Sequence, residues 1–253
     1  MPSKTDFNVS PYYDDFDKDK KFHRVMYRPA FAVQARELTT QQSILQNQIE
    51  KLGDSMYKHG SMVIPGETTY DLNHFSIKLT SFTGTLANFT DTVITGGTSG
   101  VTATVKSVSA TDGTDPDTLF VKYSNSGTDN VSASFTDGET ITSSAATGET
   151  AVVSSSHTGC AAFIDAGTYY INGFFVEVES QSLILDKYTN TPDYRVGLTV
   201  TENFITSTDD TSLLDNATGS SNANATGAHR FKITLTLAKL SLSSTADSSF
   251  IET

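Results

Sequence analysis

The chain has 253 residues, of which 37% are hydrophobic and 18% charged, which suits one large or two to three small folded domains. Its net charge of −12 is uneven: residues 1–60 carry nine Lys and Arg against eight Asp and Glu, and residues 61–253 carry eight against twenty-one. An acidic body repels phosphate backbones and anionic lipid, which argues against nucleic-acid binding. The chain has no apolar run of membrane-spanning length and no apolar signal-peptide core, so we expect neither membrane insertion nor export by that route.

Residues 1–33 are aromatic, charged and aperiodic, and Pro11 and Pro29 interrupt them. Such a segment is expected to lie extended across another surface, with its rings filling pockets, rather than to fold by itself. We therefore predict a docking arm, and its candidate contact residues are Phe7, Tyr12, Tyr13, Phe16, Phe22, Tyr27 and Phe31.

Residues 34–60 form the one stretch that predicts a long helix. Five apolar residues at spacings of 7, 4, 3 and 4 fall on a single stripe, which Ile44 is expected to widen: Leu38, Leu45, Ile49, Leu52 and Met56. Gly53 is unfavourable inside a helix and predicts a bend or an early end there.

The spacing of this stripe fits a short coiled-coil seam and equally fits a helix lying on a sheet of its own chain. The neighbouring residues are mostly Gln, Thr and Asn. Because amides can form hydrogen bonds across a symmetry axis without the desolvation cost of charges, we favour contact between subunits and keep packing within the chain as the alternative.

From residue 61 the pattern indicates antiparallel β-structure. The clearest strand pair surrounds Asn172-Gly173, which favours a tight hairpin turn. Two further alternating strands, "YRVGLTVTENFIT" and "HRFKITLTLAKL", flank a loop of about twenty residues. We predict a mainly β protein, with a sandwich-like antiparallel domain formed by residues 61–82 and 161–253.

Residues 83–160 differ in composition from the rest of the chain, since 46 of these 78 residues are Ser, Thr, Gly or Ala. "FTDTVITGGTSGVTATVKSV" from Phe89 matches "FTDGETITSSAATGETAVVSS" from Phe135 with one residue of slippage. We predict an inserted β module built from two related hairpins.

No pattern in the sequence favours catalysis or a cofactor. The five histidines lack metal-ligand spacing, and Cys160 is expected to be a buried apolar residue. "DGTDPD" (Asp112, Asp115 and Asp117) departs from the order of a calcium loop and predicts an acidic turn. We expect a protein that is not an enzyme and holds no metal.

The segment from Phe7 to Gly66, "FNVSPYYDDFDKDKKFHRVMYRPAFAVQARELTTQQSILQNQIEKLGDSMYKHGSMVIPG", resembles the opening of a family of uncharacterised virion structural proteins of tailed bacteriophages, especially T4-like phages of cyanobacteria. "GTYYINGFFVEVESQSLILDKYTNTPDYRVGLTVTEN" and "DTSLLDNATGSSNANATGAHRFKITLTL" are similar to its later half.

The resemblance implies a virion location, at the tail baseplate or in a tail-fibre-like attachment, for a protein made in the host cytoplasm. It also implies a homo-oligomer, commonly a trimer, that contacts other tail or baseplate proteins. We expect residues 1–60 to anchor and oligomerise the protein while the β body presents distal parts. The alternative function is a module that binds host-surface glycan through residues 83–160.

Overall fold

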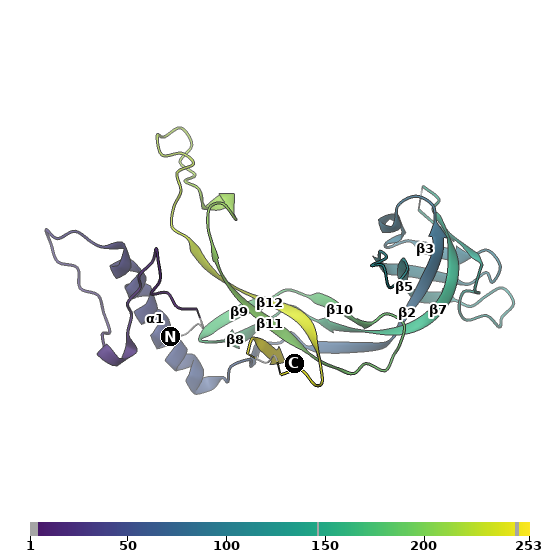
Figure 1. Ribbon diagram of the computed structural model, residues 1–253, viewed down its shortest axis with the longest axis horizontal. Helices are drawn as coiled ribbons and strands as arrows, with labels where there is room; N and C mark the ends of the chain where they lie inside the picture. Colours follow the sequence, from purple (N-terminus) through teal and green to yellow (C-terminus); the bar gives the residue numbers. More distant parts are fainter. Residues whose placement is uncertain (1–4, 146, 246–247) are drawn as a thin grey trace.

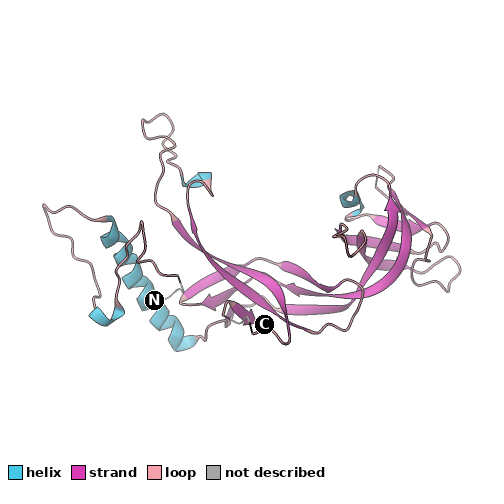
Figure 2. Ribbon diagram, in the orientation of Figure 1, coloured by secondary structure: helices cyan, strands magenta, loops and turns pink. Residues whose placement is uncertain are grey.

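The computed structural model describes residues 5–145, 147–245 and 248–253 of the chain. Residues 1–4, 146 and 246–247, which belong to the predicted arm, module and second β segment, lie outside these described residues. The molecule is elongated and curved, with a helix at one end, a strongly curled sheet at the other and long strands between them (Figures 1 and 2). It is mainly β and its sheets are antiparallel, which confirms the predicted fold class.

The described chain contains one α-helix, three short 3-10 helices and thirteen strands. The helical elements are η1 (Lys18–Lys20), α1 (Ala35–Met56), η2 (Leu86–Phe89) and η3 (Thr211–Leu213). The strands are β1 (Met62–Ile64), β2 (Thr68–Phe82), β3 (Val93–Gly96), β4 (Thr102–Ser109), β5 (Thr118–Asn125), β6 (Thr140–Ser143), β7 (Thr150–Ile164), β8 (Gly167–Ile171), β9 (Phe174–Val178), β10 (Gln181–Asp186), β11 (Tyr194–Ile205), β12 (Arg230–Ser241) and β13 (Phe250–Glu252).

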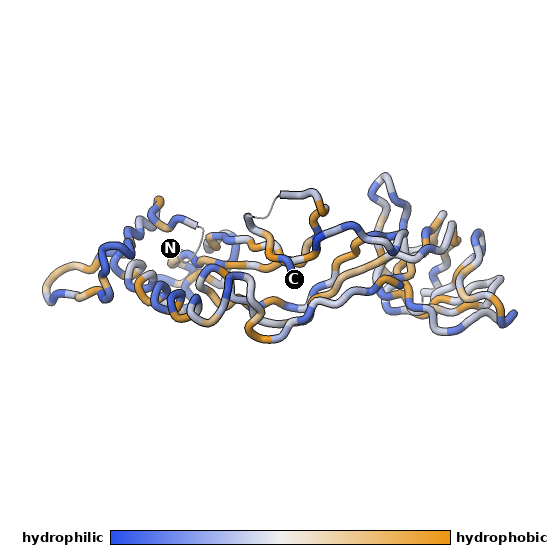
Figure 3. Tube along the Cα trace, turned by 90° about the horizontal axis from the view of Figure 1, so that it is seen from below, coloured by the Kyte–Doolittle hydropathy of each residue, from blue (hydrophilic) through white to orange (hydrophobic). Residues whose placement is uncertain are grey.

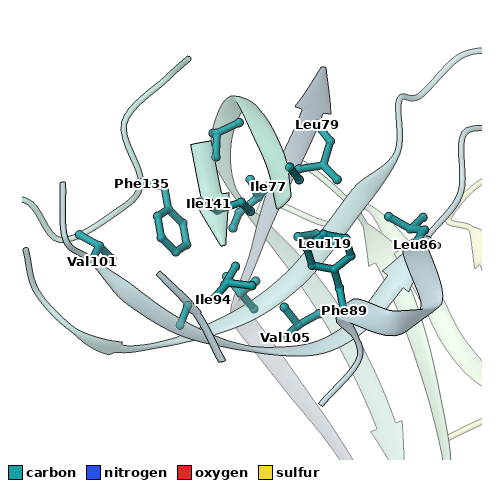
Figure 4. Close-up of a cluster of buried hydrophobic side chains, with 14 residues drawn as sticks. Ile77, Leu79, Leu86, Phe89, Ile94, Val101, Val105, Leu119, Phe135 and Ile141 are labelled. Atoms are coloured by element: carbon teal, nitrogen blue, oxygen red, sulfur yellow. The ribbon is translucent and has the colours of Figure 1, made fainter. Parts of the chain in front are cut away.

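The distal end is a closed sheet. Its strands run in the order β10-β7-β2-β5-β4-β3-β6, and β6 pairs back with β7, so six of the seven strands form a small barrel. Closure removes free edges that would otherwise pair with other chains. Aliphatic and aromatic side chains fill the interior, including Ile77, Phe89, Leu119, Phe135 and Ile141 (Figure 4).

The predicted internal repeat is confirmed as two equivalent hairpins of this barrel, β3–β4 and β6–β7. The matching residues Phe89 and Phe135 are both buried, as are Ile94 and Ile141. The two copies also pair with each other, since β3 runs antiparallel to β6. The repeat therefore builds one shared core.

A buried carboxylate holds the loop of the first hairpin against the start of the second. The two oxygens of Glu139 accept hydrogen bonds from the backbone N–H groups of Thr98 (3.0 Å), Ser99 (2.9 Å) and Thr136 (2.6 Å), and from the Ser99 hydroxyl (2.8 Å). Burial alone would raise the pKa of Glu139, but these donors outweigh it and lower the pKa. Glu139 is thus a charged structural residue of the barrel.

The barrel begins earlier than the module predicted at residues 83–160. Its core includes Ile77 and Leu79 of β2, and β2 pairs with β7 along almost its whole length. Each of these two strands is fifteen residues long and continues from the barrel into the central part of the molecule. The change in amino-acid composition predicted a module boundary at the end of β2. In the structure, β2 and β7 pair continuously across this position, so both strands belong to the barrel and to the central part.

The central part has a second core, between the proximal ends of β7 and β10, the β8–β9 hairpin and the sheet β12-β11-β13. Tyr169, Ile171, Leu198 and Leu237 are among its buried side chains. The Asn172-Gly173 turn is confirmed, because both residues have positive φ (47° and 90°) between β8 and β9. Strands β11 and β12 pair in register over their full length, as their alternating sequences predicted.

Candidate self-association surface

One polar side of helix α1 contacts the β8–β9 hairpin. The ring of Tyr170 lies directly over Gly53, and its hydroxyl donates to the Glu50 carbonyl (3.0 Å) and the Asp54 carboxylate (2.8 Å). Burial and the neighbouring Asp54 raise the pKa of Tyr170 to about 12, so the hydroxyl keeps its proton. One turn earlier, the Gln46 amide donates to the Gly173 carbonyl (2.7 Å).

The predicted early end at Gly53 is wrong. The helix continues through Gly53 to Met56, and it begins at Ala35, so it is shorter than the predicted 34–60 at its C-terminal end. A Cβ at position 53 would lie 2.6 Å from the ring carbon that bears the Tyr170 hydroxyl. Glycine is therefore present because it admits the Tyr170 ring.

The predicted stripe faces away from the rest of the described chain. Leu38, Leu45, Ile49, Leu52 and Met56 are all between 45% and 62% exposed. The alternative of packing this stripe on the chain's own sheet does not occur, because the opposite face is the one that is covered. Soluble monomers rarely expose such a continuous apolar row, so the row is a candidate contact surface.

Ile44 does not widen the stripe as predicted. It is buried on a different side of α1, where it lines the hollows beneath the segment that precedes the helix. One turn corresponds to about 3.6 residues, which places Ile44 roughly a third of a turn from the row. Apolar character alone did not distinguish the two sides.

The predicted docking arm divides into two parts, of which the first, residues 5–16, packs on its own chain. Phe7 lies edge-on to Phe231 (centroids 5.0 Å apart) and to Phe204 (5.8 Å). Tyr12 lies against Phe204 (4.8 Å), and its hydroxyl shares a hydrogen bond with His229 Nδ1 (2.7 Å).

A buried carboxylate ties the first part to the helix. Asp14 accepts hydrogen bonds from the hydroxyls of Thr40 (2.9 Å) and Ser43. Phe16 follows as a half-buried residue, whereas Tyr13 is exposed. Residues 5–16 therefore strap the helix to the tip of the β11–β12 hairpin.

The second part, residues 17–34, projects as a loop beside the N-terminal half of α1 (Figure 1). Its three predicted aromatics, Phe22, Tyr27 and Phe31, are exposed. So are Met26 and Val33, which the sequence analysis did not single out, and hydrophobic stretches are visible along this loop (Figure 3). The Tyr27 hydroxyl donates to Gln41 Oε1 (2.8 Å), and Arg28 lies over the Phe31 ring (4.0 Å).

The strap leaves a cavity of about 250 Å³ between α1 and the hairpin tip. Aromatic rings form much of its wall, and α1 contributes polar side chains. The lining includes Phe7, Tyr12, Phe174, Phe204, Phe231 and Gln42. Sequence analysis missed this site, although Phe204 and Phe231 end the two predicted strands and pair across the ladder.

Cys160 and the acidic turn have local structural partners. Cys160 is buried as predicted, and burial raises the pKa of its thiol. The acidic turn is also confirmed, with Asp112 and Asp115 paired to Lys187 (3.2 and 3.0 Å). Among the described residues there is no cluster of three or more His, Cys, Asp or Glu side chains that could hold a metal ion, and no helix has the length and apolarity needed to cross a membrane.

Of the four aromatic side chains in residues 83–160, Phe89 and Phe135 belong to the barrel core, whereas Phe120 lies on the other face of β5, where its ring stacks on His74 (5.2 Å). Phe89, Phe120 and Phe135 are buried, and the half-buried Tyr123 packs on Phe75 and Phe135. Sugar-stacking sites require an exposed ring face, which these four residues do not offer.

Comparison with known proteins gives one match. A family model described as a domain of unknown function, DUF4815, matches residues 10–131 and 123–249. No curated protein and no solved structure matches the chain. The two matched segments together span α1, the barrel and the central sheets. The chain therefore belongs to the DUF4815 family.

Proposed function

We propose that this chain is a structural protein of a tailed-phage virion, an attachment adaptor of the baseplate or tail fibre. Copies associate through the exposed row of α1, and the N-terminal region contacts other tail proteins while the β body presents what lies distal to it. The single observation that carries the self-association is that all five residues of the row are exposed on a helix whose other face is already packed. The resemblance of residues 7–66 and of the later β segments to phage virion proteins supports the location.

The mounting of the helix also supports this function. An assembly helix must hold its orientation, and α1 is fixed by the Tyr170 contact at one end and by the Asp14 strap nearer its start. Preorganised side chains lose little conformational entropy when a second copy binds. These two attachments give the row a defined orientation.

Light scattering coupled to size-exclusion chromatography tests the association. The protein is expected as a homotrimer, with a molar mass near three times 27.2 kDa at micromolar concentration. Leu45→Glu with Ile49→Glu places two charges in the row and should give a folded monomer. Gln48→Glu with Ser55→Glu, which adds the same two charges at exposed positions outside the row, is the matched control and should remain trimeric. A wild-type monomer would overturn the proposed association.

Purified virions test the location. Mass spectrometry of intact particles should detect the chain, and gold-labelled antibodies should mark the tail end. Absence of the chain from particles that contain all other tail proteins would refute the virion role, even if the protein is trimeric in solution.

A further inference from the structure

We propose that the exposed aromatic loop of one copy, residues 17–34, docks into the aromatic cavity of a neighbouring copy. The inference rests on the proposed self-association through α1 and specifies how adjacent copies are fastened. Its occupant is a second copy of this chain.

The loop has apolar side chains that its own copy does not cover. Phe22 and Met26 are 66% and 74% exposed, and Phe31 is 61% exposed although Arg28 stacks on it. Residues 17–34 are also basic, with five Lys and Arg against two Asp. This combination of exposed rings and positive charge fits an acidic surface that contains an aromatic pocket.

The cavity has the complementary chemistry. An inserted aromatic ring could contact the rings of Phe7, Phe204 and Phe231 in the cavity wall. Aromatic pairs stabilise a complex by more than the burial of their apolar area alone. Its volume of about 250 Å³ is below the range of roughly 300–1,000 Å³ usual for drug-sized ligands, so it suits one or two side chains. The cavity wall contains one Arg, Arg230, and the adjoining loop, residues 206–228, carries three Asp and no Lys or Arg.

The loop and the cavity lie on opposite sides of the exposed row. Tyr27 of the loop contacts Gln41 on one side, whereas Gln42 and Gln46 line the cavity on the other. With about 100° of rotation per residue, Gln41 and Gln46 fall on opposite flanks of the row. The loop therefore borders one flank and the cavity the other.

This arrangement brings unlike flanks together in a ring of copies. When helices pack in parallel around a rotation axis, the left flank of each faces the right flank of the next, which is a heterologous contact. Every loop then meets a neighbour's cavity, and the contact closes after one circuit. An antiparallel pair would instead bring like flanks together and would place each loop, which borders the N-terminal half of α1, beside the C-terminal half of the neighbouring helix and away from its cavity.

Photo-crosslinking of the full chain tests the proposal. A benzophenone amino acid replaces Phe22 or Phe31 in turn, and equal amounts of isotope-labelled and unlabelled protein are mixed before irradiation. Crosslinked peptides are expected to join the two isotopic forms and to map to cavity-lining residues such as Tyr12 and Gln42. The same probe at Val131, an exposed residue of the barrel, is the control and should give no crosslink to the cavity.

Association measured by analytical ultracentrifugation gives a second readout. Phe22→Ser with Phe31→Ser should raise the dissociation constant at least about tenfold, because each ring loses its burial on the neighbour. Tyr13→Ser removes an equally exposed aromatic outside the loop and should leave the constant unchanged. Suppose that Leu45→Glu with Ile49→Glu dissociates the protein, but the crosslinks from the loop reach residues outside the cavity or stay within one chain. The docking proposal is then wrong, and the association through α1 stands. If the wild type is monomeric, both are wrong.

Discussion

Substituting Gly53 by alanine gives a prediction whose sign depends on the tertiary contact. In an unobstructed helix, Gly→Ala stabilises by about 1 kcal/mol. Here the new Cβ would lie 2.6 Å from both the ring carbon Cζ and the hydroxyl oxygen of Tyr170, a side chain that is only 1% exposed. Moving the ring aside would disturb the side chains that pack on it, among them Tyr57 and Phe175.

The expected cost follows from these contacts. Overpacking at a filled site costs about 1–3 kcal/mol. Displacing the Tyr170 hydroxyl also weakens the hydrogen bonding of its single proton, which the Glu50 carbonyl and the Asp54 carboxylate share, at about 1 kcal/mol in all. After the gain in helix propensity is subtracted, Gly53→Ala should destabilise the helix mounting by about 2 kcal/mol.

Urea unfolding followed by circular dichroism, together with amide hydrogen exchange of residues 35–56, measures this cost. Exchange should accelerate in α1 while the barrel amides stay protected, because the two cores are separate. Ser55→Ala, at an exposed position of the same helix, is the control and should change stability by no more than about 0.5 kcal/mol. Stabilisation of about 1 kcal/mol by Gly53→Ala would refute the reasoning.

A second background isolates the ring as the cause. Tyr170→Leu removes the ring and opens the space above position 53. Adding Gly53→Ala to this variant should be neutral or stabilising, so the two substitutions should show strong coupling in a double-mutant cycle. Additive effects would mean that the alanine acts through some other contact.

Three further predictions concern the β body. Glu139→Gln should destabilise the barrel by about 2–3 kcal/mol in thermal or urea unfolding, because an amide cannot accept all four hydrogen bonds; an unchanged midpoint would contradict this. Residue 172 has a φ of 47°, a left-handed conformation that Gly and Asn adopt more easily than Ala. Asn172→Ala should therefore destabilise the protein by about 1–2 kcal/mol, and Asn172→Gly by less. Equal effects of the two substitutions would count against this turn geometry. Hydrogen bonds from the Asp115 and Thr114 N–H groups, and then from Lys187, lower the pKa of Asp112 to about 2. Because the folded pKa is below the unfolded one, this stabilisation is present above about pH 4 and is lost as the pH falls towards 2. The stability difference between wild type and Asp112→Asn should vanish over that interval, and a constant difference would exclude this linkage.

Much of the fold follows from local patterns in the sequence. The spacing of Leu38, Leu45 and the residues after them specified a helix with one apolar stripe, and strict alternation specified β11 and β12. Asn172-Gly173 specified a hairpin because few other residue pairs adopt two positive φ values at low cost. The repeat at Phe89 and Phe135 specified two equivalent hairpins. These signals succeed because each depends only on neighbours in the chain.

The tertiary structure alone decided what each surface meets. Ile44 and Ile49 are equally apolar, yet one is buried and the other exposed, because only one side of α1 faces the preceding segment and the hairpin. Gly53 indicates a helix break until the Tyr170 ring, more than a hundred residues later, is placed over it. The cavity joins Phe7, Phe204 and Phe231 from three distant segments. Local sequence determines the spacing of apolar residues and the residues that form turns. Which side chains are buried, and which residues meet in one cavity, is determined only when distant segments pack together.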